Sequence, residues 1–188
     1  MQITIVSPLF PPDIGAPAPY VKELAGRLTA VHGVSVVCFG NIPESVDNVT
    51  IYTVSKRAWG LIRVWRLFLT LRQVATNSDV LYVQNGPSVE LATLLFSYTN
   101  KTPIVLAISD FRATARQDSS WIRRWSAVQI AKRARRVLTF KNTEELILPT
   151  EKPEILPFGE HPTAALNEYQ DSWEQHIDGL NTILPHVR

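Results

Sequence analysis

The sequence predicts an α/β domain with a Rossmann-like, doubly wound, mostly parallel sheet of six or seven strands and helices on both faces. The strand candidates are short, continuous apolar runs, which is typical of strands buried on both faces. These runs alternate with segments whose apolar residues recur at helical spacing. The 188 residues, 45% of them hydrophobic, are enough for one such domain with a sizeable core.

The first unit consists of a strand, a long loop, a helix and a second strand. Gln2–Ser7 is apolar and β-branched, and the next apolar run is Val34–Phe39. Between them, a loop with five prolines runs into a helix in which Pro19 occupies the first turn. The loop therefore follows the carboxyl end of the first strand, where open α/β sheets bind ligands. Gly15 in this loop either brings the backbone close to a ligand or relieves a tight turn.

The remaining elements continue the alternation. Strands are predicted at Val49–Val54, Asp79–Val83, Pro103–Ile108, Val137–Phe140 and Glu154–Leu156. Helices are predicted at Ala58–Val74, Ser88–Ser97, Ser120–Arg136 and Thr143–Leu148, with Ser88 as an N-cap. A last helix carries Trp173, Ile177, Leu180 and Leu184 on one face, and an apolar face of this kind predicts docking on the domain.

Composition limits the classes of site. The single cysteine, Cys38, lies in an apolar run and is predicted to be a buried thiol in a reducing compartment. The histidines are not at metal-ligand spacing, so neither a metal nor a cofactor is expected; His32 is predicted to cap the first helix. The chain has no uncharged apolar stretch long enough to span a bilayer and no secretion signal at its start. The expected location is the cytoplasm.

Positive charge and tryptophan gather in two segments. Lys56–Arg72 holds five basic residues and no acid, and Arg112–Arg136 holds eight basic residues and one acid. Basic helices with tryptophan favour the interface of an anionic membrane, here its inner face. A solvated basic face with tryptophans in the core is the alternative; nucleic acid is not expected, because no binding motif accompanies the charge. The predicted membrane contacts are Trp59, Arg63, Arg66, Trp121, Arg123 and Arg124.

Several motifs resemble those of one enzyme family. The first loop and helix read FPPDIGAPAPYVKELAGRL, which resembles the opening motif of family 4 of the two-domain (GT-B) glycosyltransferases, and most closely members that build polysaccharides on lipid carriers. The segments DVLYVQNGP, TPIVLAISDF, ARRVLTFKNTEELIL and EILPFGEHP resemble later strands and loops of the same N-terminal domain. SWEQHIDGLNTIL resembles the final helix of the family, which crosses back onto that domain.

The resemblance also implies what the chain does not carry. The family's donor-binding domain, which grips the nucleotide sugar, has no counterpart between the hinge and the final helix. We therefore divide the chain into a Rossmann-like domain, residues 1–159, and a linker with a docking helix, residues 160–188. Glu160 and Glu168 have the spacing of a donor-site motif of the family, but any acid-rich tail yields such a pair, and no glycine-rich phosphate loop accompanies them.

The resemblance further implies site residues at the ends of three strands. Acceptor-binding positions are expected at Gly15, Ala16, Asn85, Gly86, Ser109 and Arg112, and Asp110 is the candidate catalytic base. The alternative for Asp110 is a helix N-cap or an ion pair with a nearby arginine. Ser109 stands where the family usually has histidine or arginine, so it is uncertain whether the chain acts as an enzyme by itself.

Two functions follow from the resemblance. The first is the acceptor-binding half of a GT-B glycosyltransferase in polysaccharide or glycolipid biosynthesis. It takes a lipid-linked or saccharide acceptor and needs a partner subunit that binds the nucleotide sugar. The second is a non-catalytic, Rossmann-like binding or scaffold module derived from such an enzyme. A small enzyme of unrelated chemistry is disfavoured, because the sequence shows no nucleophile–histidine or metal constellation.

Overall fold

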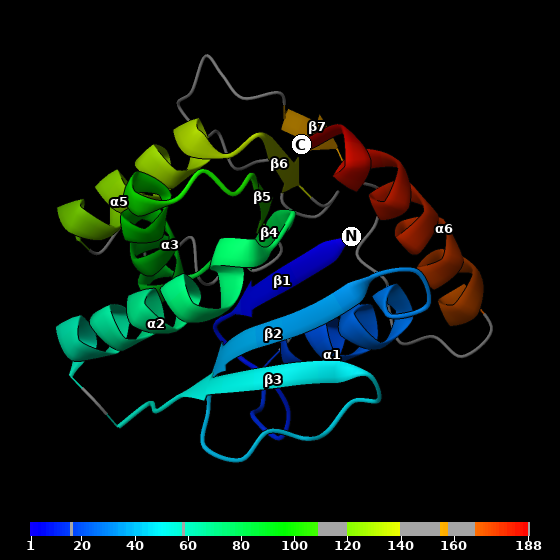
Figure 1. The fold of residues 1–188 in the computed structure, drawn as a ribbon, viewed down its shortest axis with the longest axis horizontal. Helices are drawn as coiled ribbons and strands as arrows, with labels where there is room; N and C mark the ends of the chain where they lie inside the picture. Colours follow the sequence, from blue (N-terminus) through cyan, green and yellow to red (C-terminus); the bar gives the residue numbers. More distant parts are fainter. Residues whose placement is uncertain (16, 58, 109–119, 140–154, 158–167, 188) are drawn as a thin grey trace.

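The computed structural model describes residues 1–15, 17–57, 59–108, 120–139, 155–157 and 168–187 (Figure 1). These residues form a seven-stranded sheet in which every pair of neighbouring strands is parallel, in the order β3-β2-β1-β4-β5-β6-β7. The predicted Rossmann-like, parallel α/β fold is thereby confirmed. The strands are β1 (Gln2–Ser7), β2 (Gly33–Phe39), β3 (Val49–Val54), β4 (Val80–Gln84), β5 (Ile104–Ile108), β6 (Arg136–Thr139) and β7 (Ile155–Pro157).

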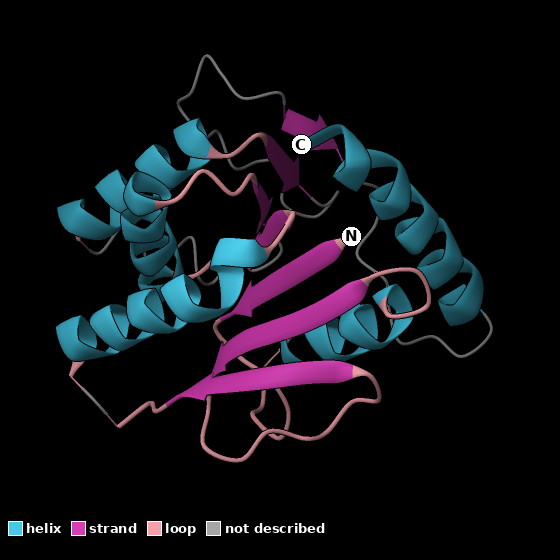
Figure 2. Ribbon diagram, in the orientation of Figure 1, coloured by secondary structure: helices cyan, strands magenta, loops and turns pink. Residues whose placement is uncertain are grey.

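Helices cover both faces of the sheet (Figure 2). The α-helices are α1 (Pro17–Leu28), α2 (Gly60–Val74), α3 (Pro87–Thr99), α5 (Trp121–Arg133) and α6 (Glu168–Ile183), with short 3-10 turns at Ala75–Asn77 and Leu184–Val187. Helices α2, α3 and α5 share one hydrophobic core with the sheet, and α1 and α6 share the other. Because side chains alternate along a strand, Leu106 of β5 enters the first core while Val105 and Ala107 enter the second.

Helix α6 packs over α1 on the second face of the sheet. Trp173, Leu180 and Leu184 are fully buried there, and Ile177 packs against the same core. The ring of Trp173 stacks on Tyr20 of α1 with centroids 5.5 Å apart. The spacing of the apolar residues in the tail therefore produces a buried face. The division into a domain and a linker stays a prediction, since residues 160–167 lie outside the described part.

The structure contradicts one predicted helix cap and supports another. Helix α3 begins at Pro87 with Gly86 as its N-cap residue, so the prediction of Ser88 as N-cap is wrong. A proline at the first helical position costs no hydrogen bond, because that N–H has no acceptor within the helix. The backbone N–H of His32 donates to the carbonyl of Leu28 at 3.0 Å, so His32 caps the end of α1 as predicted. The ring Nε2 of His32 also lies 3.1 Å from Oδ1 of Asn181 on α6. The helix predicted at Thr143–Leu148 lies outside the described residues.

Candidate functional site

The candidate site lies where β1 and β4 end. Strands β2 and β3 extend from one side of β1, and β4 to β7 from the other, so the order of strands reverses between β1 and β4. Ligands of open α/β sheets bind beyond the carboxyl ends of the strands at this point. The loops after β1 and β4 meet there: a Cβ built on Gly86 would lie 3.2 Å from Cβ of Pro8. Glycine thus permits a close approach of the two loops.

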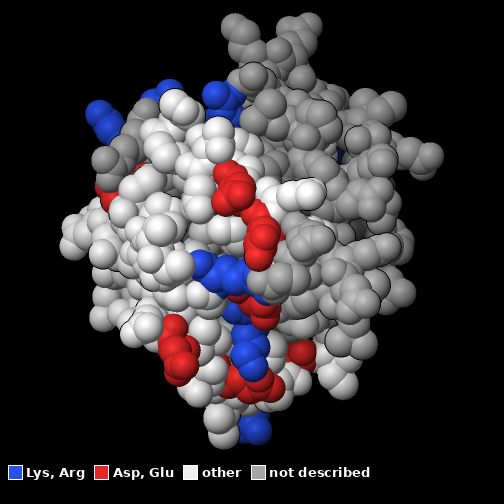
Figure 3. All heavy atoms as spheres, turned by 90° about the vertical axis from the view of Figure 1, so that its right-hand side faces the viewer, with Lys and Arg blue, Asp and Glu red and all other residues white. Residues whose placement is uncertain are grey.

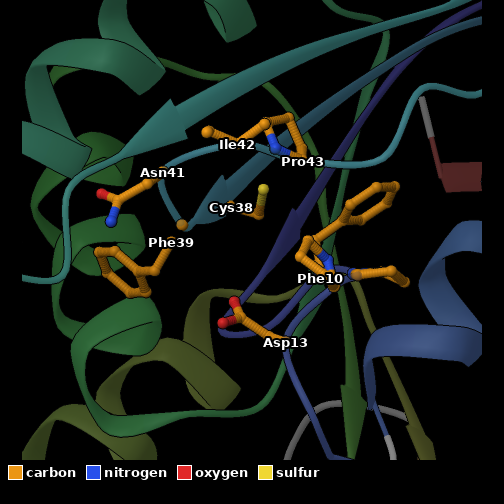
Figure 4. A pocket seen from close by; sticks show the side chains of 10 residues that line it. Phe10, Asp13, Cys38, Phe39, Asn41, Ile42 and Pro43 are labelled. Atoms are coloured by element: carbon orange, nitrogen blue, oxygen red, sulfur yellow. The ribbon is translucent and has the colours of Figure 1, made fainter.

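A first pocket, which we call the Phe10 pocket, opens between the loops that follow β1 and β2 (Figure 4). Its volume is about 250 Å³. Aromatic rings, prolines, a carboxylate and an amide surround it. Its lining consists of Phe10, Pro11, Pro12, Asp13, Cys38, Phe39, Gly40, Asn41, Ile42 and Pro43.

A second pocket, which we call the arginine pocket, lies beside the start of α3 and has a volume of about 310 Å³. Three cationic side chains reach it from three different elements. Lys56 follows β3, Arg63 belongs to α2, and Arg123 belongs to α5. Its other lining residues are Pro8, Leu9, Phe39, Gly86, Pro87, Ser88 and Val89. Among the residues that the structure describes, no carboxylate lines this pocket.

An ion pair lies between the two pockets. Asp13, which lines the Phe10 pocket, forms an ion pair with Lys56, which lines the arginine pocket; Oδ2 of Asp13 and Nζ of Lys56 are 2.5 Å apart. Phe39 lines both pockets. The Cys38 thiol is beside this pair, and its pKa is raised to about 12, mainly by burial and further by the negative charge of Asp13, although Lys56 lowers it. The thiol is therefore protonated and unreactive at neutral pH, as expected from its apolar run.

The residues implied by the family resemblance are only partly brought together. Gly86 lines the arginine pocket, whereas Asn85 is buried and donates its backbone N–H to the carbonyl of Ala107 at 2.9 Å. Gly15 lines neither of the two pockets; a Cβ there would lie 2.5 Å from Cδ1 of Leu9, and its carbonyl accepts the N–H of Ala18. These contacts favour the tight-loop interpretation of Gly15. Ala16, Ser109, Asp110 and Arg112 lie outside the described residues.

The tryptophans of the basic segments are on the surface. Trp59 is 85% exposed and Trp121 is 77% exposed, while Trp65 and Trp125 are about half exposed, so the alternative that places them in the core is wrong. They lie just before or in the first halves of α2 and α5, the helices on either side of α3. These helix starts are at the carboxyl edge of the sheet (Figure 1). The opposite side of the molecule, around α6, carries both signs of charge close together (Figure 3).

The arginines predicted as membrane contacts divide into two groups. Arg63, which is half-buried, and Arg123, which is exposed, line the arginine pocket; Arg66 and Arg124 are exposed and do not line it. Membrane contact of all four stays a prediction.

Sequence reasoning did not single out Asp13 or Lys56 as site residues. A signal for both was present, because each polar side chain comes shortly after a predicted strand that belongs to the same parallel sheet. Pairing of β1 with β2, and of β2 with β3, then places the two loops at one edge. The parallel direction of neighbouring strands could thus have suggested that Asp13 and Lys56 lie near each other, although not that they form an ion pair.

Two absences concern the described residues. Within them, no group of three histidine, cysteine, aspartate or glutamate side chains is placed to hold a metal ion. None of the helices found there combines the length and the apolar character needed to cross a bilayer.

Comparisons with known proteins identify the fold. No family model and no curated protein matches the chain. Among solved structures, a sucrose-phosphate synthase chain from Thermosynechococcus elongatus is similar with a TM-score of 0.61 at 10% identity, over 98% of this chain and 99% of that one. A UDP-N-acetylglucosamine 2-epimerase from Listeria monocytogenes is similar with a TM-score of 0.57 at 13% identity, over 85% of this chain. This chain spans only 44% of the epimerase chain. The chain accordingly shares a Rossmann-like α/β fold with both of these structures.

Proposed function

We propose that this chain is the acceptor-side domain of a GT-B glycosyltransferase of family 4 type, acting in polysaccharide or glycolipid biosynthesis. A partner subunit or domain supplies the nucleotide sugar. The main support is the Phe10 pocket, which opens between the loops after β1 and β2 at the carboxyl edge of the sheet and combines aromatic rings with the Asp13 carboxylate and the Asn41 amide. Apolar walls with a few polar groups are typical of small-ligand sites.

The chemistry of the Phe10 pocket suits a saccharide. A sugar ring presents C–H groups to an aromatic face and hydroxyls to hydrogen-bond acceptors. The Asp13 carboxylate is held by Lys56 and has a second oxygen that can accept a sugar hydroxyl. We assign Asp13 a positioning role, because a carboxylate fixed by an ion pair orients the acceptor hydroxyl. Asp110 remains the predicted base for deprotonating that hydroxyl.

A binding experiment tests the acceptor role. Farnesyl-diphosphate-linked glucose, galactose and N-acetylglucosamine are titrated into the protein by calorimetry, beside UDP-glucose and GDP-mannose. At least one acceptor analogue is expected to bind saturably, and the nucleotide sugars are expected to bind weakly or not at all. Asp13→Asn should lower the affinity for the acceptor analogue by roughly tenfold, which is the usual effect of losing a hydrogen bond to a charged group.

Glu23→Gln is the matched control, since it also removes a carboxylate from an ion pair, here with Arg27 on α1. It should leave binding unchanged. Tight binding of a nucleotide sugar to the chain alone would contradict the need for a partner. If no acceptor analogue binds to the folded protein, the acceptor role is wrong and the non-catalytic binding module is favoured.

We also propose that the domain attaches to an anionic membrane surface through the starts of α2 and α5. Exposed tryptophans stand beside Arg66 and Arg124 there, and neither helix contains an acid. Tryptophan inserts into the interfacial layer of a bilayer, while arginine interacts with anionic head groups. Because these helix starts lie at the same edge of the sheet as the two pockets, attachment would present the site to a lipid-linked acceptor.

A further inference from the structure

We infer that the arginine pocket is a binding site for a phosphate or diphosphate group. The inference deepens the proposed function and rests on it for the identity of the natural ligand, which would be a phosphorylated acceptor with its sugar in the neighbouring Phe10 pocket. The evidence for the pocket itself is independent of glycosyl transfer.

Arg63 is held in place as an anion-binding residue would be. Its Nη2 donates to Oγ of Ser88 at 3.3 Å, and its guanidinium carbon lies 5.5 Å from the ring centre of Phe39. Its Nε is buried and has no hydrogen-bond partner among the described residues. A guanidinium has a planar fork of donors that matches two oxygens of one phosphate. A ligand in the pocket would therefore find a charged donor that is already oriented.

The start of α3 adds further donors to the same pocket. Gly86, Pro87, Ser88 and Val89 line it, and they form the N-cap and first turn of a helix of 13 residues. The backbone N–H groups of a first turn lack acceptors within the helix, and the helix dipole makes this end positive. Glu90, the acid of this first turn, is buried and does not line the pocket. Helix donors and the three cationic side chains thus favour the same class of ligand.

The ion pair between the pockets points to a ligand that spans both. Lys56 is shared, because it bonds Asp13 on one side and lines the arginine pocket on the other. A phosphate would draw on the lysine charge from one side, while a sugar hydroxyl would reach Asp13 from the other. A sugar attached to a phosphate or diphosphate meets both requirements, whereas an uncharged saccharide leaves the three cations of the arginine pocket without a ligand group.

Inorganic pyrophosphate is the probe for the pocket. Calorimetry at physiological ionic strength should show saturable binding of one pyrophosphate per chain. Arg63→Gln and Arg123→Gln should each weaken it by about tenfold or more, since each removes charge-assisted hydrogen bonds. Arg66→Gln and Arg124→Gln make the same charge change on the same two helices outside the pocket, and they should alter the affinity by less than about twofold. Equal losses in both pairs of variants, or no binding to the wild type, would overturn the inference.

Two further probes distinguish the sources of the phosphate. Farnesyl diphosphate should compete with pyrophosphate for the pocket, and Arg63→Gln should weaken its binding, as expected for a lipid-linked acceptor. Binding to phosphatidylglycerol vesicles should instead be weakened by Arg66→Gln. If vesicle binding is weakened by Arg63→Gln and not by Arg66→Gln, the pocket binds a membrane head group and the acceptor assignment is wrong. If pyrophosphate binds as expected but no sugar-linked analogue binds, the proposed function fails and the phosphate site stands.

Discussion

The hydroxyl of Tyr20 lies 2.8 Å from Nε2 of His176, although 156 residues separate the two in the sequence. The same hydroxyl lies 2.9 Å from that of Tyr82 on β4, so one buried oxygen connects α1, α6 and the sheet. Burial, with the neighbouring hydroxyl, raises the pKa of Tyr20 well above its usual value, and burial likewise raises that of Tyr82. Both hydroxyls therefore keep their protons at neutral pH and can donate.

Tyr20→Phe is expected to destabilise the protein. The change keeps the ring but leaves the hydroxyl of Tyr82 and the ring nitrogen of His176 without this partner in the core. A buried polar group that loses its partner costs about 1–3 kcal/mol. Urea denaturation followed by circular dichroism measures the difference. Tyr98→Phe, at a position that is 57% exposed on α3, is the control and should change the free energy of unfolding by less than about 0.5 kcal/mol.

Trp173→Ala tests the packing of α6. The side chain is 1% exposed, stacks on Tyr20, and lies under the guanidinium of Arg27 at 5.4 Å. Replacing a buried tryptophan with alanine costs about 3–5 kcal/mol. Trp59→Ala removes the same atoms at a position that is 85% exposed and should leave thermal stability nearly unchanged. Equal melting temperatures for the Trp173 variant and the wild type would mean that α6 does not stabilise the domain.

Alkaline pH should weaken the fold through Cys38. Its pKa is about 12 in the folded chain, whereas the pKa of an unfolded cysteine thiol is about 8.5. Below the unfolded value both states hold the proton and the stabilisation is complete. As pH rises from there toward the folded pKa, the unfolded chain binds fewer protons, so the free energy of unfolding falls. Urea denaturation between about pH 8 and 9, where an unfolded tyrosine with a pKa of about 10 still holds its proton, should show this slope, and Cys38→Ala should make it shallower.

Vesicle binding tests the exposed tryptophans. Sedimentation with phosphatidylglycerol vesicles should decrease with added salt, because screening reaches about 10 Å at 0.1 M. The double variant Trp65→Ala, Trp121→Ala should bind several-fold less, roughly as expected for lost interfacial insertion of aromatic rings. Val31→Ala changes an apolar residue that is 61% exposed beyond the end of α1, and it should bind as the wild type does. Equal binding to neutral and anionic vesicles would contradict an electrostatic attachment.

Much of the fold follows from local patterns. Continuous apolar runs such as Val34–Phe39 and the helical period around Leu24 predicted the parallel α/β sheet, because burial on two faces forces each pattern on the sequence. The docking of the last helix was predicted on the same grounds, because Trp173 and Leu180 would otherwise leave a large apolar patch exposed to solvent. Helix boundaries were less certain. Ser88 reads as a cap, but the helix starts one residue earlier, because Pro87 suits the first position.

The sequence determined which side chains are apolar, which are charged, and which follow the end of a strand. It left the two basic segments with several interpretations, because a helical pattern does not say which part of its polar face meets another element. Only the tertiary structure separated Arg63, which lines a pocket, from Arg66, which is exposed on the same helix. The reason is physical: both pockets are built from residues of strands and helices far apart in the chain, so their shape depends on strand order and on side-chain packing across loops. The Asp13–Lys56 pair, and with it the division between the Phe10 pocket and the arginine pocket, came from that packing alone.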